Sequence, residues 1–318
     1  MRSTTRRVGF AVKLLGGGGL PSHDTRRWQS GPHLRVSLQY LDRIFDYLEE
    51  TGIRMYRMAS SLAPYASHPD MPQFRHQVDE CLRELDRLGA RARQADLRLS
   101  MHPGQFTVLN STNEGVVRAA VEELEVHAEI LDALGLSSEA VIVIHVGGRP
   151  DGPQPAFDRF EAGFARLSER ARARLVIEND DRSFSLGDAL EVARRVEQPV
   201  VWDVLHHYCN DPDGIGDREA LRLALETWPR EVRPKIHFSS PRSALMERRV
   251  RRGRKMVRTL VPPPEGAHAD LVDPIAYRNF LETAGPDTRP FDIMLEAKGK
   301  DLALLRLRAQ LERRGMTV

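Results

Sequence analysis

Cysteine is scarce in this sequence of 318 residues, which has Cys81 and Cys209 and no other thiol. Two cysteines cannot build a disulfide framework, and their separation does not match the spacing of a cysteine metal site. We therefore expect a protein of a reducing, cytoplasmic compartment.

The sequence also lacks any uncharged run that approaches the roughly 20 residues needed to cross a bilayer. Its first residues, "MRSTTRRVGFAVKLLGGGGL", place arginines before an apolar stretch, as an export signal does. That stretch is short, contains Lys13 and has no small-residue cleavage site, so we interpret it as the first strand. The sequence predicts a soluble protein with no membrane partner.

A large excess of charge of one sign is missing too. The formal net charge is +2, so the overall charge does not indicate a nucleic-acid partner. Charge is nevertheless clustered locally, because "RRVRRGRKMVR" at 248–258 has seven basic residues and no acidic one. Such a run is usually only a solvated surface, but beside an active site it could follow a phosphate backbone.

What the sequence does contain is an alternation of short apolar runs with longer amphipathic ones. The runs predicted as strands are residues 7–12, 53–59, 97–102, 141–146, 174–179, 200–204, 235–239 and 291–297. Helical patterns with three- and four-residue spacing lie between them, as at 34–52, and the last is near 300–314. Gly52 and Gly135 are placed to end two of these helices.

Eight strand–helix units whose strands are apolar on both faces predict an α/β protein with a (β/α)8 TIM barrel. A doubly wound open sheet is the alternative. No composition break or internal repeat divides the chain, so we expect a single domain over 1–318. Two connections, 13–33 and 240–272, are long enough to be functional or mobile loops on the active face.

Six successive predicted strands end on side chains that can bind a metal. These are His102, His145, Glu178, Asp203, His237 and Glu296, with His206 just beyond the sixth strand and His268 in the long loop after the seventh. Each alone would be an ordinary core histidine or a solvated carboxylate. Together, at the barrel end where active sites form, they would concentrate buried charge unless cations compensate it.

Imidazole and carboxylate without thiolate suit Mn²⁺, Zn²⁺ or Fe²⁺. Eight candidate ligands exceed what one ion accepts while keeping an open position, so we expect two or three ions. Such a centre suits displacement at a phosphodiester, where metals activate water and stabilise the leaving oxygen.

Other residues at the same rim are candidates for substrate contact. Lys235 lies two residues before His237 and shares its face, where it either pairs with carboxylates, as the residues alone favour, or carries a carbamate that bridges metals. His68 could contact a substrate phosphate. Gln105 and Phe106 could wedge into a base stack, unless Phe106 only caps the barrel core.

Several motifs together resemble one family. They are "HPGQF", "VIVIHVGG", "VIENDD", "WDVLHH", "KIHFSSPR", "HADLVDP" and "MLEAK". The chain resembles the UV damage endonucleases (UvdE/UvsE type) of the xylose-isomerase-like barrel group, relatives of endonuclease IV, from "RVGFAV" to "MLEAKGKDLALL". The resemblance implies a monomeric, metal-dependent endonuclease that nicks damaged double-stranded DNA immediately 5′ to a UV photoproduct. The products would be a 3′-hydroxyl and a 5′-phosphate.

The resemblance also assigns roles to residues. It implies up to three ions, typically Mn²⁺ although Zn²⁺ or Mg²⁺ would also suit the site, on the eight ligands named above. It places the family's carbamylated lysine (N6-carboxylysine) on Lys235, which reverses the preference for an ion pair. It places the histidine near the scissile phosphate on His68, and it makes Glu178 and Glu296 catalytic as well as metal-binding.

DNA contacts are expected from the remaining candidates. They are Gln105, Phe106, Phe10, Arg248, Arg249, Arg251, Arg252, Arg254 and Lys255. The chain departs from the family here, because the duplex-probing pair is commonly Gln-Tyr and a tyrosine and an asparagine usually follow strand 1. This chain has Phe106 and Phe10 at the aromatic positions and no such asparagine, so the range of lesions stays open.

Three other functions compete with this interpretation. A sugar isomerase or epimerase on a related barrel would need fewer metal ligands and would gain little from the basic run. An abasic-site endonuclease would share the metals and differ in the damage that it recognises. A binding protein that marks damage without cutting would not need all eight ligands.

Overall fold

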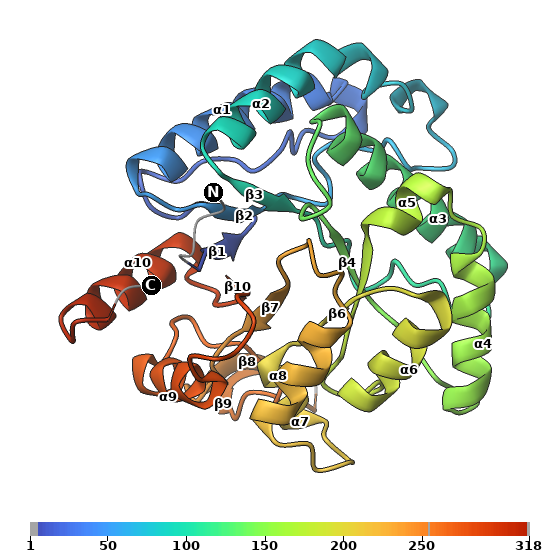
Figure 1. The fold of residues 1–318 in the computed structure, drawn as a ribbon. Helices are drawn as coiled ribbons and strands as arrows, with labels where there is room; N and C mark the ends of the chain where they lie inside the picture. The colour runs from blue at the N-terminus through green and yellow to red at the C-terminus, as the bar shows by residue number, and fades with distance from the viewer. Residues whose placement is uncertain (1–5, 254, 317–318) are drawn as a thin grey trace.

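The computed structural model describes residues 6–253 and 255–316, and eight parallel strands form its centre (Figure 1). These strands are β1 Val8–Ala11, β2 Met55–Arg57, β3 Arg98–Ser100, β4 Ile142–His145, β5 Leu175–Glu178, β6 Val200–Val201, β7 Lys235–Phe238 and β10 Asp292–Leu295. They pair in the orders β3-β2-β1-β10-β7 and β4-β5-β6. Parallel bridges between Met101 and Ile142, and between Asp203 and His237, join the two groups.

The strands therefore close into a ring, which confirms the (β/α)8 barrel. In a doubly wound sheet the first and last strands would lie at different places in an open order. Here β1 pairs directly with β10, with Val8 opposite Ile293. The open-sheet alternative is wrong.

The helices surround the barrel and bury their apolar faces against it (Figure 1). They are α1 Leu34–Glu50, α2 Leu82–Gln94, α3 Glu114–Ala133, α4 Pro153–Phe164, α5 Glu169–Arg174, α6 Leu186–Val196, α7 Val204–Cys209, α8 Asp217–Glu226, α9 Pro274–Ala284 and α10 Lys300–Glu312. Short 3-10 turns are η1 Trp28–Ser30, η2 Pro72–Phe74 and η3 Asp79–Cys81. None of the described helices is long and apolar enough to span a membrane.

Two glycines end helices as the sequence predicts. Gly52 follows α1 with a φ of +64°, and Gly135 follows α3 with a φ of +60°. Side chains rarely adopt this left-handed conformation, and glycine adopts it without steric cost. Each chain reversal then returns the backbone toward the next strand.

The N-terminal end of the barrel is closed by a buried ion pair. Arg98, at the start of β3, donates to Asp292, at the start of β10, over 2.9 Å, and both side chains are buried. Asp292 also accepts hydrogen bonds from the backbone and side chain of Arg7. Because side chains alternate along a strand, the next inward positions point toward the opposite end of the barrel. That opposite end holds the candidate ligands.

The long connection 240–272 contains structure that the sequence did not predict. Residues Met246–Arg252 (β8) and Lys255–Val261 (β9) form an antiparallel hairpin. The sequence indicated only a long connection here, and its role as a functional loop stays a prediction. The prolines at 262–264 follow β9 directly, as expected because proline has no N–H to continue a ladder.

Loss of the buried Asp292 carboxylate at the N-terminal end of the barrel should destabilise the fold far more than loss of an exposed carboxylate. Asp292→Asn leaves the buried Arg98 guanidinium without its counter-ion and is expected to lower the free energy of unfolding by about 3–5 kcal/mol. Asp96→Asn is the matched control, because Asp96 also pairs with Arg7 but is half exposed, and it should cost about 1 kcal/mol or less. Urea denaturation measures both, and equal losses would contradict this account of the closure.

Candidate metal centre

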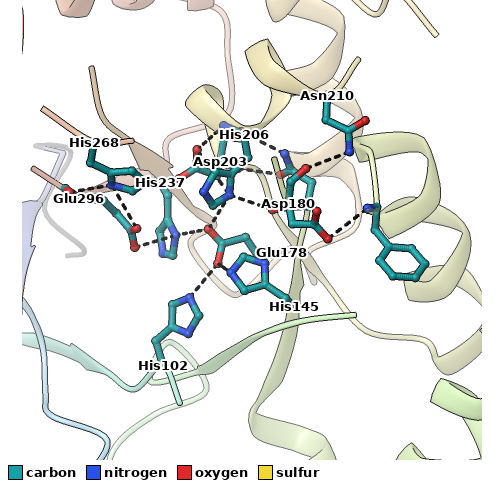
Figure 2. Close-up of polar contacts among 12 residues, drawn as sticks. His102, His145, Glu178, Asp180, Asp203, His206, Asn210, His237, His268 and Glu296 are labelled. Atoms are coloured by element: carbon teal, nitrogen blue, oxygen red, sulfur yellow. Dashed lines mark hydrogen bonds and ion pairs between the residues drawn. The ribbon is translucent and has the colours of Figure 1, made fainter. Parts of the chain in front are cut away.

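Glu178 is the central side chain of a cluster at the C-terminal end of the barrel (Figure 2). It is the last residue of β5 and is completely buried. One carboxylate oxygen lies 2.9 Å from Nε2 of His102 and 3.5 Å from Nε2 of His145. The other lies 2.6 Å from Nδ1 of His237. Three strand ends thus place an imidazole against one buried carboxylate.

Glu296 is the second carboxylate of the cluster and follows β10. Its Oε1 lies 3.2 Å from Nδ1 of His237 and is ion-paired with Arg57 of β2. His268 donates from Nδ1 to the Glu296 backbone oxygen over 2.8 Å, and the same nitrogen lies 3.8 Å from the Glu296 carboxylate. The long loop after β7 therefore returns to the rim at His268.

The ligand atoms fall into two groups that share one residue. His102, Glu178, His237 and Glu296 form the first group, and His145, Glu178 and His206 form the second. Within each group all ligand atoms lie within 4.8 Å of one another. Because Glu178 has two oxygens and belongs to both groups, it would contribute a ligand atom to each group if cations were bound.

Two further predicted ligands adjoin these groups without belonging to them. Asp203, which follows β6, is buried, and its Oδ1 lies 3.8 Å from Nδ1 of His206. Asp203 also caps α7, since the same oxygen accepts from the His206 backbone N–H over 2.8 Å. The structure thus brings all eight predicted ligands to one rim, with Asp203 and His268 at its margins.

The donor set fits divalent cations. His237 Nε2, His145 Nδ1 and Asp203 Oδ2 are buried and have no hydrogen-bond partner among the described residues. Buried polar atoms in folded proteins are nearly always satisfied, so three orphans around two carboxylates indicate a missing partner. Nitrogen and oxygen donors without sulfur match Mn²⁺, Zn²⁺ or Fe²⁺.

The side chains of the cluster shift one another's pKa values. Burial alone would raise the pKa of Glu178, but the nearby His237 and His145 hold it well below its usual range. Burial also lowers the pKa of His102 to about 4 despite its bond to Glu178, which leaves the neutral imidazole that a metal requires. Burial opposes the charged form of His206, but Asp203, Glu178 and Glu296 outweigh it and raise its pKa to about 9.

Lys235 lies inside the barrel, one inward position before His237 on β7. Its side chain is fully buried, and its Nζ has no hydrogen-bond partner among the described residues. Burial, with Arg98 and Arg57 nearby, lowers its pKa well below the usual lysine range. The ion pair that the residues alone favoured is therefore not formed at hydrogen-bonding distance with any described carboxylate.

Gln105 and Phe106 lie beside the cluster of candidate ligands. Phe106 is 81% exposed, so the alternative that it caps the barrel core is wrong. The pair lines a cavity of about 1020 Å³ whose wall also includes His145, His206 and Asp180. A large open pocket therefore connects the exposed ring to the ligands.

The other residues predicted to contact DNA lie in different environments. Phe10 is fully buried and packs edge-to-face on Tyr56 at 5.4 Å, so the prediction that it contacts DNA is wrong. His68 lies in the connection after β2, where its Nδ1 accepts from the Asp70 N–H, and its role stays a prediction. In the basic segment, Arg248, Arg249, Arg251, Arg252 and Lys255 are exposed on the hairpin. Arg254 lies outside the described residues.

Sequence reasoning missed two residues that support the cluster. Arg57, a charge at the last position of an apolar strand, pairs with Glu296. Asn179 follows Glu178, and its side-chain amide exchanges two hydrogen bonds with the Asp203 backbone, at 2.9 and 3.1 Å. The backbone oxygen of Asn179 also contacts Nδ1 of His206 at 3.0 Å. Their positions in the sequence could have indicated them, since both lie at or next to strand ends on the rim that carries the ligands.

A family model described as UV-endonuclease UvdE matches residues 34–317. The chain belongs to this family. It is 34% identical over 270 residues to a protein of Bacillus velezensis named UV DNA damage endonuclease, covering 85% of this chain and 78% of that one. The crystal structure of SacUVDE matches with a TM-score of 0.80 and 30% identity, covering 98% of this chain and 99% of that one.

Sugar epimerases share the fold at a greater distance. The structure of a D-tagatose 3-epimerase-like protein matches with a TM-score of 0.57 and 13% identity over 96% of each chain. At this identity the likeness concerns the barrel alone.

The shared position of Glu178 predicts unequal losses of metal. Glu178→Gln removes the charged ligand of both groups, so bound Mn²⁺ should fall nearly to zero, because an amide does not bridge cations as a carboxylate does. His145→Asn, which also introduces an amide, affects one group and should remove about one ion. Elemental analysis of protein equilibrated with Mn²⁺ measures both variants. Equal losses, with circular dichroism unchanged, would contradict the shared role.

Proposed function

We propose that this member of the UvdE family is a metal-dependent DNA endonuclease that nicks double-stranded DNA immediately 5′ to UV photoproducts. The products are a 3′-hydroxyl and a 5′-phosphate. The observation that carries the proposal is the double ligand group around Glu178, open to a cavity edged by an exposed aromatic ring. We further propose that the enzyme acts as a single-domain monomer without an obligate protein partner.

The residues that would hold the metals are the eight at the rim, with His102, Glu178, His237 and Glu296 around one position and His145, Glu178 and His206 around the next. When bound, two or three divalent ions, with Mn²⁺ preferred over Zn²⁺ or Mg²⁺, supply an activated water and stabilise the leaving oxygen of the phosphodiester.

The protein positions these ligands before substrate arrives. Asn179 fixes the backbone of Asp203, and Asp203 in turn caps the helix that carries His206. Arg57 pairs with Glu296 and so holds that carboxylate toward His237. Such supporting contacts orient the ligands and raise their affinity. His68 is proposed to contact the phosphate that is cut.

Lys235 is proposed to act as a carbamate. Its amine is buried without a hydrogen-bond partner among the described residues, and the lowered pKa favours the neutral form with which CO₂ reacts. The nitrogen of the neutral amine would form a bond to the carbon of CO₂ and release one proton to solvent, which would convert the uncharged amine into an anionic carbamate with two oxygen donors. This product would satisfy both the lysine nitrogen and the neighbouring cations, as the family resemblance implies.

Lys235→Arg tests the carbamate, because arginine keeps the positive charge and forms no carbamate. We expect metal affinity to fall by about 10–100-fold, the range for removing a group that supports ligands, and nicking to be lost. Lys298→Arg, on the exposed side of the same rim, is the control and should change neither quantity. Labelling with ¹³C-bicarbonate should give a carbamate carbon signal in the wild type alone. Full metal occupancy and activity in Lys235→Arg would favour a plain lysine.

Lesion recognition is proposed to depend on Gln105 and Phe106 entering the duplex. A photoproduct disturbs base stacking, so a ring that takes the place of a lost stack gains more at a damaged site than at an intact one. The cavity beside the ring is large enough to receive displaced nucleotides, at about 1020 Å³.

Phe106→Ala should weaken binding to damaged duplex by about 1–3 kcal/mol, the worth of one stacking face. Binding to undamaged duplex should change far less. Phe106→Tyr restores the ring that is common in the family and should bind like the wild type. Titrations of both duplexes measure the ratio of affinities, and an unchanged ratio in Phe106→Ala would disprove the wedge.

The rival functions are separated by one cutting assay. Purified protein with Mn²⁺ is incubated with duplexes that carry one defined photoproduct, one abasic site or no lesion, and the cut is mapped on a sequencing gel. Cutting immediately 5′ to the photoproduct is expected. Cutting of the abasic duplex alone would identify an abasic-site endonuclease, and binding without cutting would identify a damage-marking protein. Turnover of ketose sugars instead would identify an epimerase.

A further inference from the structure

The β8–β9 hairpin is an arm attached next to the metal centre. Its two strands form seven residue pairs, from Met246 opposite Val261 to Arg252 opposite Lys255. Its base is held by an antiparallel bridge between Pro241 and His268 and by the hydrogen bond from Arg242 N–H to Ala267 O at 2.7 Å. Because His268 is one of the eight candidate ligands, the arm begins at the rim where cutting is proposed.

This arm has a large net positive charge, whereas the rest of the chain has a net negative charge. Residues 246–261 include seven basic residues and one acidic residue, which gives six net positive charges. Since the whole chain has a net charge of +2, the rest of it has four net negative charges. The protein body thus offers a polyanion no net attraction, and the arm offers a strong one.

The register divides the arm into two faces, because residues directly opposite one another point to the same side. Face 1 holds Glu247, Arg249, Arg251, Met256, Arg258 and Leu260, and face 2 holds Met246, Arg248, Val250, Arg252, Lys255, Val257, Thr259 and Val261. Each face has three basic side chains, and all six are exposed. Positive charge is therefore displayed on both sides of a two-stranded ribbon.

Like charges also lie directly opposite one another. Arg249 pairs with Arg258 on face 1, and Arg252 pairs with Lys255 on face 2. Such pairs destabilise a sheet, and a two-stranded hairpin is only marginally stable in water. Glu247 offsets part of this repulsion through its ion pair with Arg258 at 3.2 Å, but both partners are exposed. Anions on both faces would remove the repulsion that remains.

We propose that the β8–β9 arm enters the major groove of duplex DNA beside the cutting site, edge first, with its two faces toward the phosphates of the two strands. A flat DNA surface would satisfy one face, whereas a groove has phosphates on both walls. A strand pair with side chains on both faces is about 10 Å thick. It fits the major groove of about 12 Å and exceeds the minor groove of about 6 Å.

The reach of the arm sets the extent of the contact. Seven residues per strand extend about 23 Å at 3.3 Å per residue, which corresponds to about six or seven base pairs. The choice of DNA as occupant rests on the proposed function. An acidic protein surface would instead engage one face, and the experiment below separates these outcomes.

The test measures binding to an undamaged duplex in the presence of a chelator, so that neither lesion recognition nor cutting contributes. Three variants remove equal charge: the face 1 triple R249Q/R251Q/R258Q, the face 2 triple R248Q/R252Q/K255Q, and the body control R43Q/R83Q/R218Q on α1, α2 and α8. Fluorescence anisotropy at several salt concentrations gives the slope of log Kd against log salt. Each arm triple should reduce that slope by about 2–3, since each phosphate contact contributes about 0.9.

The body control should leave the slope unchanged. If only one of the two arm triples reduces the slope, the groove geometry is wrong. If neither triple reduces it, the arm does not contact DNA. R249K/R251K/R258K preserves charge and should bind like the wild type. If this variant binds as weakly as the glutamine triple, charge is not the cause and the proposal fails.

A minor-groove ligand such as netropsin identifies the groove. It should leave the difference between wild type and each arm triple intact, and abolition of that difference would refute the major-groove assignment. Failure of the nicking assay would leave this binding result standing, and nicking with arm-independent binding would refute the arm alone.

Discussion

The buried carboxylate of Glu178 is the constraint on which the candidate site depends. An unpaired charge at this depth would be prohibitively costly, so its three neighbouring imidazoles are required as soon as it is buried. The cluster nevertheless leaves His237 Nε2, His145 Nδ1 and Asp203 Oδ2 without hydrogen-bond partners among the described residues. The imidazoles and carboxylates of the cluster therefore do not satisfy one another completely.

The barrel supplies this arrangement through strand alternation. On β7 the inward positions are Lys235 and His237, and the neighbouring β10 begins on Asp292 and leads to Glu296. Asp292 pairs with Arg98 and Arg7 at the N-terminal end of the barrel, and Lys235 is buried where Arg98 and Arg57 both lower its pKa. The strand alternation that closes one end of the barrel therefore also places a buried lysine one inward position before His237.

Much of this could be predicted from the sequence, and the failures have physical causes. Strand ends were predictable because eight parallel strands of one barrel must place their C-terminal residues on one rim, and Glu178 and His237 fall there. The hairpin was not predictable, because basic residues interrupt the alternation of apolar and polar residues that marks a strand, as in "RRVRRGRK". Phe10 was misplaced because a strand residue next to an active rim can point either inward to the core or outward to substrate. Arg57 was overlooked because its partner, Glu296, lies 239 residues away.

The central claim is that Glu178 bridges two cations at the mouth of the barrel. Anomalous diffraction at the manganese edge from crystals grown with Mn²⁺ tests it most directly. The account predicts two peaks that share Glu178, one also contacting His102, His237 and Glu296 and the other contacting His145 and His206. A single peak that does not touch Glu178, or density that fills the cluster with water alone, would contradict it.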